Sequence, residues 1–217
     1  MPTYYPVFLD IRGRKSVVIG GGEVAERKLR LLLECGARVT VVSPEATPAV
    51  QARAQAGELR WEARSYRPGD LQGAAIAIAA TDDPKVNRAI AQEAALERVL
   101  LNVVDQTALC TFIAPAVARR GPVTLAISTG GASPALARKL RESFEGGCAS
   151  GCALAYADLA DVLSDARAEL KRRKANVNAE RWQECIDEPL LSLAQRGQRQ
   201  EALDLLLSRL LALAEAG

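Results

Sequence analysis

The sequence contains no histidine, the side chain that most often transfers protons near neutral pH. Any acid–base step must therefore use a carboxylate, a thiol, a lysine, a tyrosine or water, and a metal site would have to form without imidazole ligands. Neither sign of charge dominates, because 28 basic and 26 acidic residues leave a formal net charge of +2. This balance gives no general reason to expect binding to nucleic acid or to a membrane surface.

Long apolar runs are also lacking, because no stretch of the sequence reaches the roughly 18 apolar residues of a membrane-spanning helix. The N-terminus has no positively charged segment followed by a long apolar run, so no secretion signal is predicted. The five cysteines are odd in number and irregularly spaced, which favours reduced thiols over disulfides. We therefore expect a cytoplasmic protein.

The most informative segment is KSVVIGGGEVAE, in which an apolar run ends in three glycines that lead into an amphipathic segment. This strand–turn–helix pattern is typical of a dinucleotide-binding site. Gly20 allows the tight turn, and Gly22 lets a pyrophosphate approach the backbone. The pyrophosphate would lie on the free N–H groups at the start of the helix, where we expect Glu23 and Val24.

The helix after the glycines shows an apolar stripe at positions i, i+4, i+7 and i+8, which predicts one face packed against a core. The stripe consists of Ala25, Leu29, Leu32 and Leu33, and Ala25 is also the small residue that close packing of helix and strand requires. The basic residues of the same helix are expected to lie in solvent: Arg27, Lys28 and Arg30.

The ribose-binding position differs from the usual pattern. An acidic residue commonly binds the adenosine ribose about 20 residues after the glycines, and this chain has Ser43-Pro44-Glu45 in its place. Ser43 can still hydrogen-bond the ribose, and no arginine or lysine lies at positions 43–46 to hold a 2′-phosphate. The segment favours NAD over NADP.

Strand-like runs alternate with helical patterns through the first half of the chain, which predicts a Rossmann-type α/β fold with a parallel sheet. Asp83 is placed to cap the helix after the fourth strand, and Pro84 suits its first position. Thr81 and Asp82 precede this helix, so we expect them at the carboxyl edge of the sheet beside the cofactor. The strands are expected at residues 16–20, 37–42, 59–63, 74–80 and 99–104.

The pattern changes after residue 104. Two strand-like runs, 112–118 and 123–129, are joined by Arg119-Arg120-Gly121-Pro122 and predict a hairpin. A helix capped by Ser133 is expected next. The residue pattern from Cys148 onward predicts helices. The leucine-rich segment 198–216 should be buried against other helices or a partner chain.

Four segments carry a family resemblance: YPVFLDIRGRKSVVIGGGEVAERK, AATDD, LNVVD and STGGASPALARKLRE. Together they resemble the precorrin-2 dehydrogenase family, whose members oxidise precorrin-2 to sirohydrochlorin and in some cases also insert iron to give siroheme. The resemblance implies NAD as the oxidant and a homodimer whose cleft holds the tetrapyrrole. It also implies a Rossmann domain at residues 1–113, a small dimerisation domain at 114–146 and a helical domain at 147–217.

Asp105, at the end of LNVVD, occupies the position of the family's catalytic aspartate. A carboxylate just beyond the fifth strand would lie at the carboxyl edge of the sheet, near the nicotinamide. Oxidation transfers a hydride to NAD and releases a proton, which this carboxylate can accept, and the same base could serve iron insertion. The alternative is that Asp105 only caps the turn before Gln106 and Thr107.

Asn102 lies inside a predicted strand, where asparagine is unfavourable. We expect it to contact the cofactor together with Val103, and the alternative is a buried amide satisfied within the fold. The turn after the hairpin could offer N–H groups to substrate carboxylates or be only a helix start. Nearby arginines would suit a carboxylate-rich substrate, although most arginines on helices are simply solvated. The predicted substrate-binding residues are Ser128, Gly130, Gly131, Ser133 and Arg138.

No metal site is predicted. Cys148 and Cys152 would share one helical face, but no histidine or further close cysteine completes a ligand set. Two functions remain open. One is an NAD-dependent dehydrogenase acting on precorrin-2, and the other is a non-catalytic Rossmann regulator that senses NAD or a tetrapyrrole.

Overall fold

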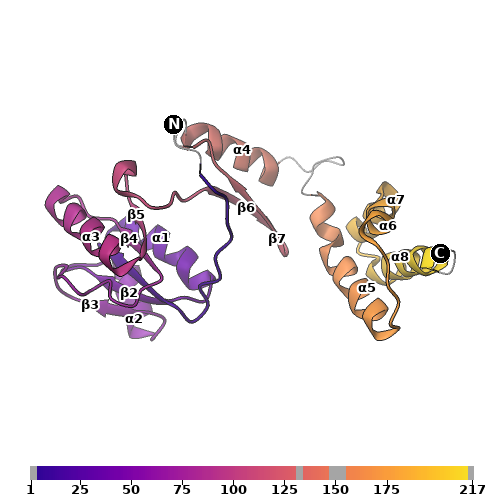
Figure 1. Cartoon of the computed structure of the whole chain (residues 1–217), viewed down its shortest axis with the longest axis horizontal. Helices are drawn as coiled ribbons and strands as arrows, with labels where there is room; N and C mark the ends of the chain where they lie inside the picture. The colour runs from indigo at the N-terminus through magenta and orange to yellow at the C-terminus, as the bar shows by residue number, and fades with distance from the viewer. Residues whose placement is uncertain (1–3, 131–133, 147–154, 215–217) are drawn as a thin grey trace. The chain divides into compact units, whose positions relative to one another are not determined.

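The computed structural model describes residues 4–130, 134–146 and 155–214, and the chain divides into two units, Met1–Ala114 and Pro115–Gly217 (Figure 1). The first unit is built on a five-stranded parallel sheet, and the second contains a two-stranded antiparallel hairpin and helices. The predicted Rossmann-type α/β fold with C-terminal helices is confirmed. The division of the second unit into a dimerisation domain and a helical domain at residue 146 stays a prediction.

The strands of the first unit run in the order β3-β2-β1-β4-β5, all parallel. The chain moves outward from β1 to β3 and then crosses to the other side of β1, so the direction of winding reverses between β1 and β4. Such a switch point is where open parallel sheets bind ligands. The strands are β1 Lys15–Ile19, β2 Arg38–Val42, β3 Arg60–Glu62, β4 Ile76–Ala79 and β5 Leu100–Val103.

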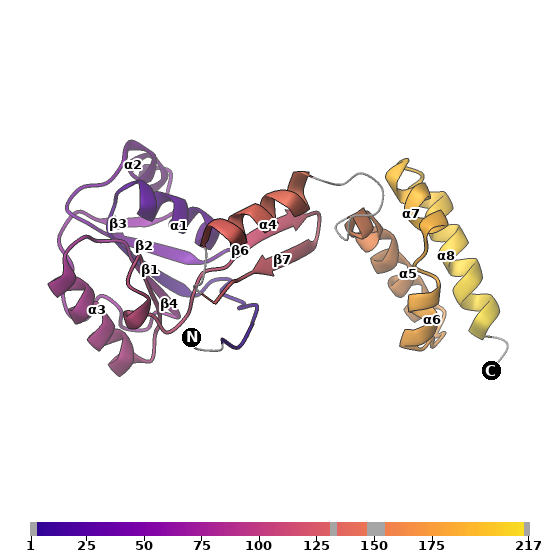
Figure 2. The same cartoon turned by 90° about the horizontal axis from the view of Figure 1, so that it is seen from above.

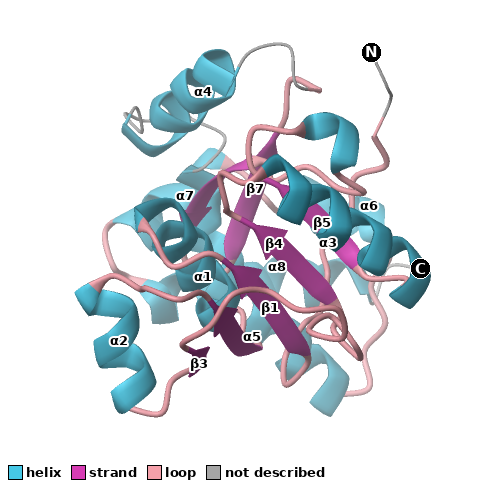
Figure 3. Ribbon diagram, turned by 90° about the vertical axis from the view of Figure 1, so that its left-hand side faces the viewer, coloured by secondary structure: helices cyan, strands magenta, loops and turns pink. Residues whose placement is uncertain are grey.

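Helices cover both faces of this sheet. Figure 3 shows α1 (Glu23–Glu34) and α2 (Pro48–Gln55) on one side of the strands and α3 (Pro84–Glu97) on the other. Neighbouring residues of β1 point to opposite faces, so Val18 packs in the core below α1 while Val17 packs in the core below α3. Because both faces are buried, the strands are almost continuously apolar.

The helix cap and the apolar stripe predicted from the sequence are present in the first unit. The Asp83 carboxylate accepts hydrogen bonds from the N–H groups of Lys85 at 2.7 Å and Val86 at 3.4 Å, and Pro84 begins α3. The predicted stripe of α1 is buried at Ala25, Leu29 and Leu32. No described helix of either unit is long and apolar enough to cross a membrane.

The hairpin of the second unit consists of β6 (Ala116–Arg120) and β7 (Val123–Ile127). Gly121 has φ of +52° at the first of the two turn residues, a conformation that tight hairpin turns require and glycine adopts without strain. Figure 2 shows α4 (Pro134–Gly146) lying along the hairpin.

The predicted first strand of the hairpin, 112–118, was wrong at its start, and Arg119 and Arg120 belong to β6 rather than to the turn. The reason is that the N–H groups of Thr111 and Phe112 both donate to the carbonyl oxygen of Leu101, at 2.8 and 3.3 Å. The apolar run from Phe112 therefore begins alongside β5, and the hairpin starts only after it.

The remaining helices pack around a shared apolar core. They are the 3₁₀ turn η2 Ala155–Leu159 and the helices α5 Ala160–Arg172, α6 Ala179–Glu184, α7 Glu188–Gln195 and α8 Arg199–Ala214. The predicted burial of the leucine-rich last segment against other helices is confirmed, because α8 contributes Ala202, Leu206, Leu207 and Leu210 to this core.

A polar cluster fixes the loop between β3 and β4. The Arg64 guanidinium donates to both carboxylate oxygens of Asp70, at 2.9 and 2.7 Å, and the N–H group of Arg67 donates to the same carboxylate at 2.8 Å. Lys15, at the start of β1, donates to the carbonyl oxygen of Asp70 at 3.0 Å. Burial raises the pKa of Asp70, but the hydrogen bonds from Arg64 and Arg67 outweigh it and hold the pKa below its ordinary value.

We expect Asp70→Asn to lower the free energy of unfolding by roughly 1–2 kcal/mol near neutral pH, because it breaks a part-buried bidentate ion pair. A carboxyl whose pKa is lowered by folding stabilises the protein above its unfolded pKa, and this contribution is lost as the pH falls through the folded pKa. Urea unfolding near pH 7 and at about pH 3 checks both points. Asp10→Asn, which removes an exposed ion pair with Arg12, should have little effect. If Asp70→Asn lowered the free energy of unfolding as much at about pH 3 as near pH 7, the Asp70 ion pair would not be the source of the stability.

Candidate active site at the carboxyl edge of the sheet

Four parallel strands end level with one another. Ile19 pairs with Val42 on one side and with Ala79 on the other, and Ala79 pairs with Val103. Neighbouring strands lie about 4.8 Å apart, so the loops that follow β2, β1, β4 and β5 all begin at one edge. These loops carry most of the predicted site residues of the first unit: Gly20, Gly22, Ser43, Pro44, Glu45, Thr81, Asp82 and Asp105.

The glycine turn is held by close backbone contacts. Gly20 has φ of +112°, and a Cβ atom there would lie 2.2 Å from the carbonyl oxygen of Ala80. A Cβ atom at Gly21 would lie 2.2 Å from the carbonyl oxygen of Glu45. The N–H group of Thr47 also donates to the carbonyl oxygen of Gly21 at 2.9 Å. The turn is therefore fixed against the loops after β2 and β4, and Gly21 is a requirement of the site that the sequence did not reveal.

Gly22 is exposed and stands at the N-cap of α1, where a Cβ atom would meet nothing within 4 Å. No side chain caps the helix there, so the first N–H groups, including those of Glu23 and Val24, have no intrahelical or side-chain acceptor among the described residues. Free N–H groups and the positive end of the helix dipole favour a bound phosphate. The residues present fit the pyrophosphate of a dinucleotide.

The segment after β2 contains a hydroxyl group, on Ser43, that is available to a ligand. Ser43 is 9% exposed, its carbonyl oxygen accepts from the Trp61 indole N–H at 3.0 Å, and its N–H group donates to the carbonyl oxygen of Glu62 at 3.2 Å. The Ser43 hydroxyl makes no hydrogen bond within the described part of the chain, whereas Pro44 and Glu45 are exposed. This arrangement leaves the hydroxyl able to bind a ribose.

Hydrogen bonds from α3 and the residue before it hold the loop after β4 in place. The Thr81 hydroxyl accepts from the N–H group of Asp83 at 3.2 Å, and the Thr81 carbonyl oxygen accepts from the Asn87 side-chain amide at 2.9 Å. Asn87 is fully buried in α3, a position at which the sequence suggested no role. Asp82 is exposed at the edge, so the loop presents its backbone and one carboxylate there.

The polar residue inside β5 is explained by the fold. The Asn102 amide donates to the carbonyl oxygen of Phe112 at 3.2 Å, which agrees with the alternative of an amide satisfied within the fold. Cys110 closes the loop after β5, because its sulfur accepts from the N–H group of Val103 at 3.1 Å and its thiol donates to the Val103 carbonyl oxygen at 3.3 Å. Contacts of Asn102 and Val103 with a cofactor stay predictions.

Asp105 is exposed and has φ of +58°, a left-handed conformation that few residues other than glycine, asparagine and aspartate adopt. Its carboxylate accepts no hydrogen bond from the described residues. The short helix η1 that follows (Thr107–Leu109) has Gln106 at its N-cap, without a side-chain cap. The alternative that Asp105 caps this turn is therefore wrong, and the carboxylate is free at the edge of the sheet.

Lys28 differs from expectation, because it is half-buried rather than solvated. Burial lowers the pKa of the Lys28 ammonium and the nearby charge of Arg27 lowers it further, while the carboxylate of Asp105 acts in the opposite direction. Lys28 is therefore close enough to the loop after β5 for Asp105 to influence its pKa. The spacing of apolar residues in α1 could not reveal this, because the pattern of one helix does not show which other segments pack against it.

The predicted substrate residues that the structure describes lie in the second unit. The Ser128 hydroxyl accepts from the N–H group of Gly130 at 3.1 Å, and Gly130 has φ of +63°. Arg138 pairs with Glu142 at 2.8 Å on the exposed surface of α4. Gly131 and Ser133 lie outside the described residues, as do Cys148 and Cys152. The substrate role of these residues stays a prediction.

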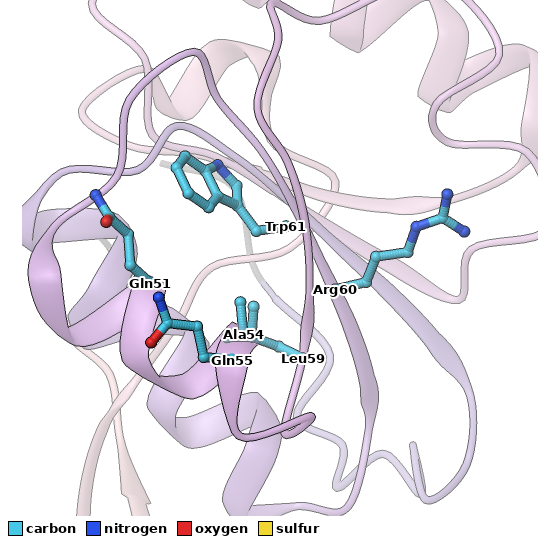
Figure 4. A pocket seen from close by; sticks show the side chains of 6 residues that line it. All are labelled: Gln51, Ala54, Gln55, Leu59, Arg60 and Trp61. Carbon is cyan, nitrogen blue, oxygen red and sulfur yellow. The ribbon is translucent and has the colours of Figure 1, made fainter.

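Two further features lie outside the edge of the sheet. The described residues contain no group of three histidine, cysteine, aspartate or glutamate side chains placed to hold a metal ion. A pocket of about 410 Å³ between α2 and β3 contains none of the predicted cofactor residues (Figure 4). It is lined by Gln51, Ala54, Gln55, Leu59, Arg60 and Trp61.

Comparison with known proteins agrees with this geometry. A family model described as putative NAD(P)-binding matches residues 7–116, and one described as sirohaem biosynthesis protein central matches residues 120–146. The chain is 41% identical to the siroheme synthase of Stutzerimonas stutzeri over 95% of its length and 40% identical to that of Nitrosomonas europaea over 94%. It spans only 44% and 42% of those relatives.

Among solved structures, the chain is similar to SirC, named as a precorrin-2 dehydrogenase, with a TM-score of 0.71 and 27% sequence identity. The alignment covers 94% of this chain and 98% of SirC. The similarity therefore extends over both units, beyond the NAD(P)-binding domain.

We expect Gly22→Asp to weaken NAD binding by at least about 100-fold, because the added carboxylate would face the pyrophosphate and block its approach to the backbone. Aspartate is a favoured N-cap residue, so the variant should fold. Gly22→Ala is the matched control, since its methyl group enters open space and should cost much less. Calorimetric titration with NAD measures both variants, and a folded Gly22→Asp protein with unchanged affinity would remove the cofactor assignment.

Proposed function

Because the chain belongs to the family of siroheme synthase N-terminal modules, we propose that it oxidises precorrin-2 to sirohydrochlorin with NAD as the oxidant. One observation carries the proposal: the free carboxylate of Asp105 lies at the same edge of the sheet as a glycine turn that fits a dinucleotide. The similarity to SirC over nearly the full length of both chains supports the choice of substrate.

Residues in the segments after β1 and β2 would bind the cofactor. The N–H groups at Glu23 and Val24 hold the pyrophosphate, and the Ser43 hydroxyl binds the adenosine ribose. When bound, NAD supplies the acceptor for a hydride. NAD is preferred over NADP because no arginine or lysine lies at positions 43–46, next to the ribose site, to hold a 2′-phosphate.

Asp105 is the proton acceptor. Precorrin-2 loses two hydrogens on oxidation, one as a hydride and one as a proton, and the Asp105 carboxylate takes the proton as the carbon–hydrogen bond gives up its hydride. In a chain without histidine, a solvent-accessible carboxylate is a suitable base for this step. Iron insertion, which also needs a base for the pyrrole protons, stays a prediction.

The geometry of Asp105 favours an enzyme over a non-catalytic sensor. A sensor needs only the glycine turn and a ligand pocket, and it gains nothing from a left-handed aspartate whose side chain holds no described part of the fold together.

We expect Asp105→Asn to lower the turnover of precorrin-2 by about 10²–10⁴-fold, because it removes the base while keeping the size of the side chain. Asparagine adopts the left-handed conformation readily, so the loop should keep its shape. Sirohydrochlorin absorbance gives the rate, and unchanged NAD affinity confirms the fold. A variant that oxidises precorrin-2 at the wild-type rate would overturn the assignment of Asp105.

A homodimer is part of the proposal. Leu136 and Leu140 are 51% and 39% exposed on one face of α4, although this helix packs along the hairpin with its other face. Exposed apolar side chains at successive turns of a helix are typical of an interface. A second copy of the chain would cover them.

Leu140→Asp should therefore convert a dimer into a monomer in sedimentation velocity, because a buried carboxylate without a partner destabilises an interface. Ser208→Asp adds the same charge at an exposed position of a different helix, α8, and should leave the dimer intact. A wild-type protein that sediments as an active monomer at low concentration would defeat the proposal of a homodimer.

A further inference from the structure

Lys28 is a half-buried cation that the fold leaves without a partner. Its ammonium makes no hydrogen bond or ion pair with the residues that the structure describes, although the side chain is half-buried and lies within electrostatic reach of Asp105 in the loop after β5. Burying a charge costs free energy unless an opposite charge or a hydrogen-bond acceptor compensates it. Arg30 on the same helix is different, because it is exposed and lies 3.9 Å from Glu34.

The position of Lys28 points toward the proposed reaction centre. Val104 and Phe112 pack at the margin of the core that α1 covers, so the loop that carries Asp105 begins beside that core. Helical side chains lean toward the N-terminus of their helix, which brings the Lys28 ammonium toward the turn that begins at Val24.

Lys28 also lies on one face of α1 between two exposed apolar side chains. Val24 and Leu31, one turn before it and one turn after it, are 39% and 40% exposed. Two accessible apolar side chains on either side of a cation suit a ligand that has an apolar ring system and acidic side groups. A tetrapyrrole with acetate and propionate groups has this character.

We infer that Lys28 binds a carboxylate of the tetrapyrrole substrate and so places the ring beside Asp105. This inference rests on the proposed function and assigns a residue to the substrate side of it. The electrostatic reason is direct: a substrate rich in carboxylates is repelled by the anionic Asp105, and a neighbouring ammonium offsets that repulsion. Charge pairing in a shielded position is stronger than at an exposed surface.

The test compares Lys28→Met, Lys28→Arg and the control Arg30→Met by steady-state kinetics with precorrin-2 and by fluorescence titration with sirohydrochlorin. Lys28→Met should raise the KM for precorrin-2 and the Kd for sirohydrochlorin about tenfold. The kcat value and the affinity for NAD should change little. Lys28→Arg should recover most of the loss, and Arg30→Met should behave as wild type. Added salt should weaken sirohydrochlorin binding more in the wild type than in Lys28→Met.

Wild-type KM and Kd values in a folded Lys28→Met protein would overturn the inference. So would a loss confined to NAD affinity, which would place Lys28 on the cofactor, or a loss confined to kcat, which would make it a positioning residue for Asp105. The titration does not depend on turnover. A wild type that binds sirohydrochlorin through Lys28 but never oxidises precorrin-2 would reject the proposed function and keep the contact.

Discussion

The close approach of the glycine turn to its two neighbouring loops is the constraint on which the rest of the site depends. The backbone at Gly20 and Gly21 lies so near the carbonyl oxygens of Ala80 and Glu45 that no Cβ atom fits between them. This contact joins the ends of β2, β1 and β4 at the switch point of the sheet and starts α1 at Gly22 with its N–H groups uncapped. A phosphate site follows from the backbone alone, without a basic side chain.

The chemistry beside this turn uses few residue types. In the absence of histidine, Asp105 can act as the base because the fold leaves its carboxylate free, and Cys110 has a structural role because its thiol ties the loop after β5 back to Val103. The charge of Asp105, in the same loop, partly offsets the effect of burial on the pKa of Lys28. One loop thus carries an exposed carboxylate within electrostatic reach of a half-buried ammonium.

Local signals in the sequence predicted what depends on a few neighbouring residues. The turn at Gly20 and Gly22, the cap at Asp83 and the position of Asp105 after β5 follow from such signals. The requirement for Gly21 could not be predicted, because it comes from the carbonyl oxygen of Glu45, in a different loop. The start of the hairpin was mispredicted for the same reason, since it depends on how residues 101–112 fold back on the sheet.

The central claim is that this edge of the sheet transfers a hydride from precorrin-2 to NAD. The most direct measurement is an anaerobic reaction of the purified protein with precorrin-2 and NAD, in which NADH and sirohydrochlorin are quantified together. The account predicts equal amounts of the two products, with slower formation when NADP replaces NAD. Tight binding of NAD and of the tetrapyrrole without formation of either product would contradict it.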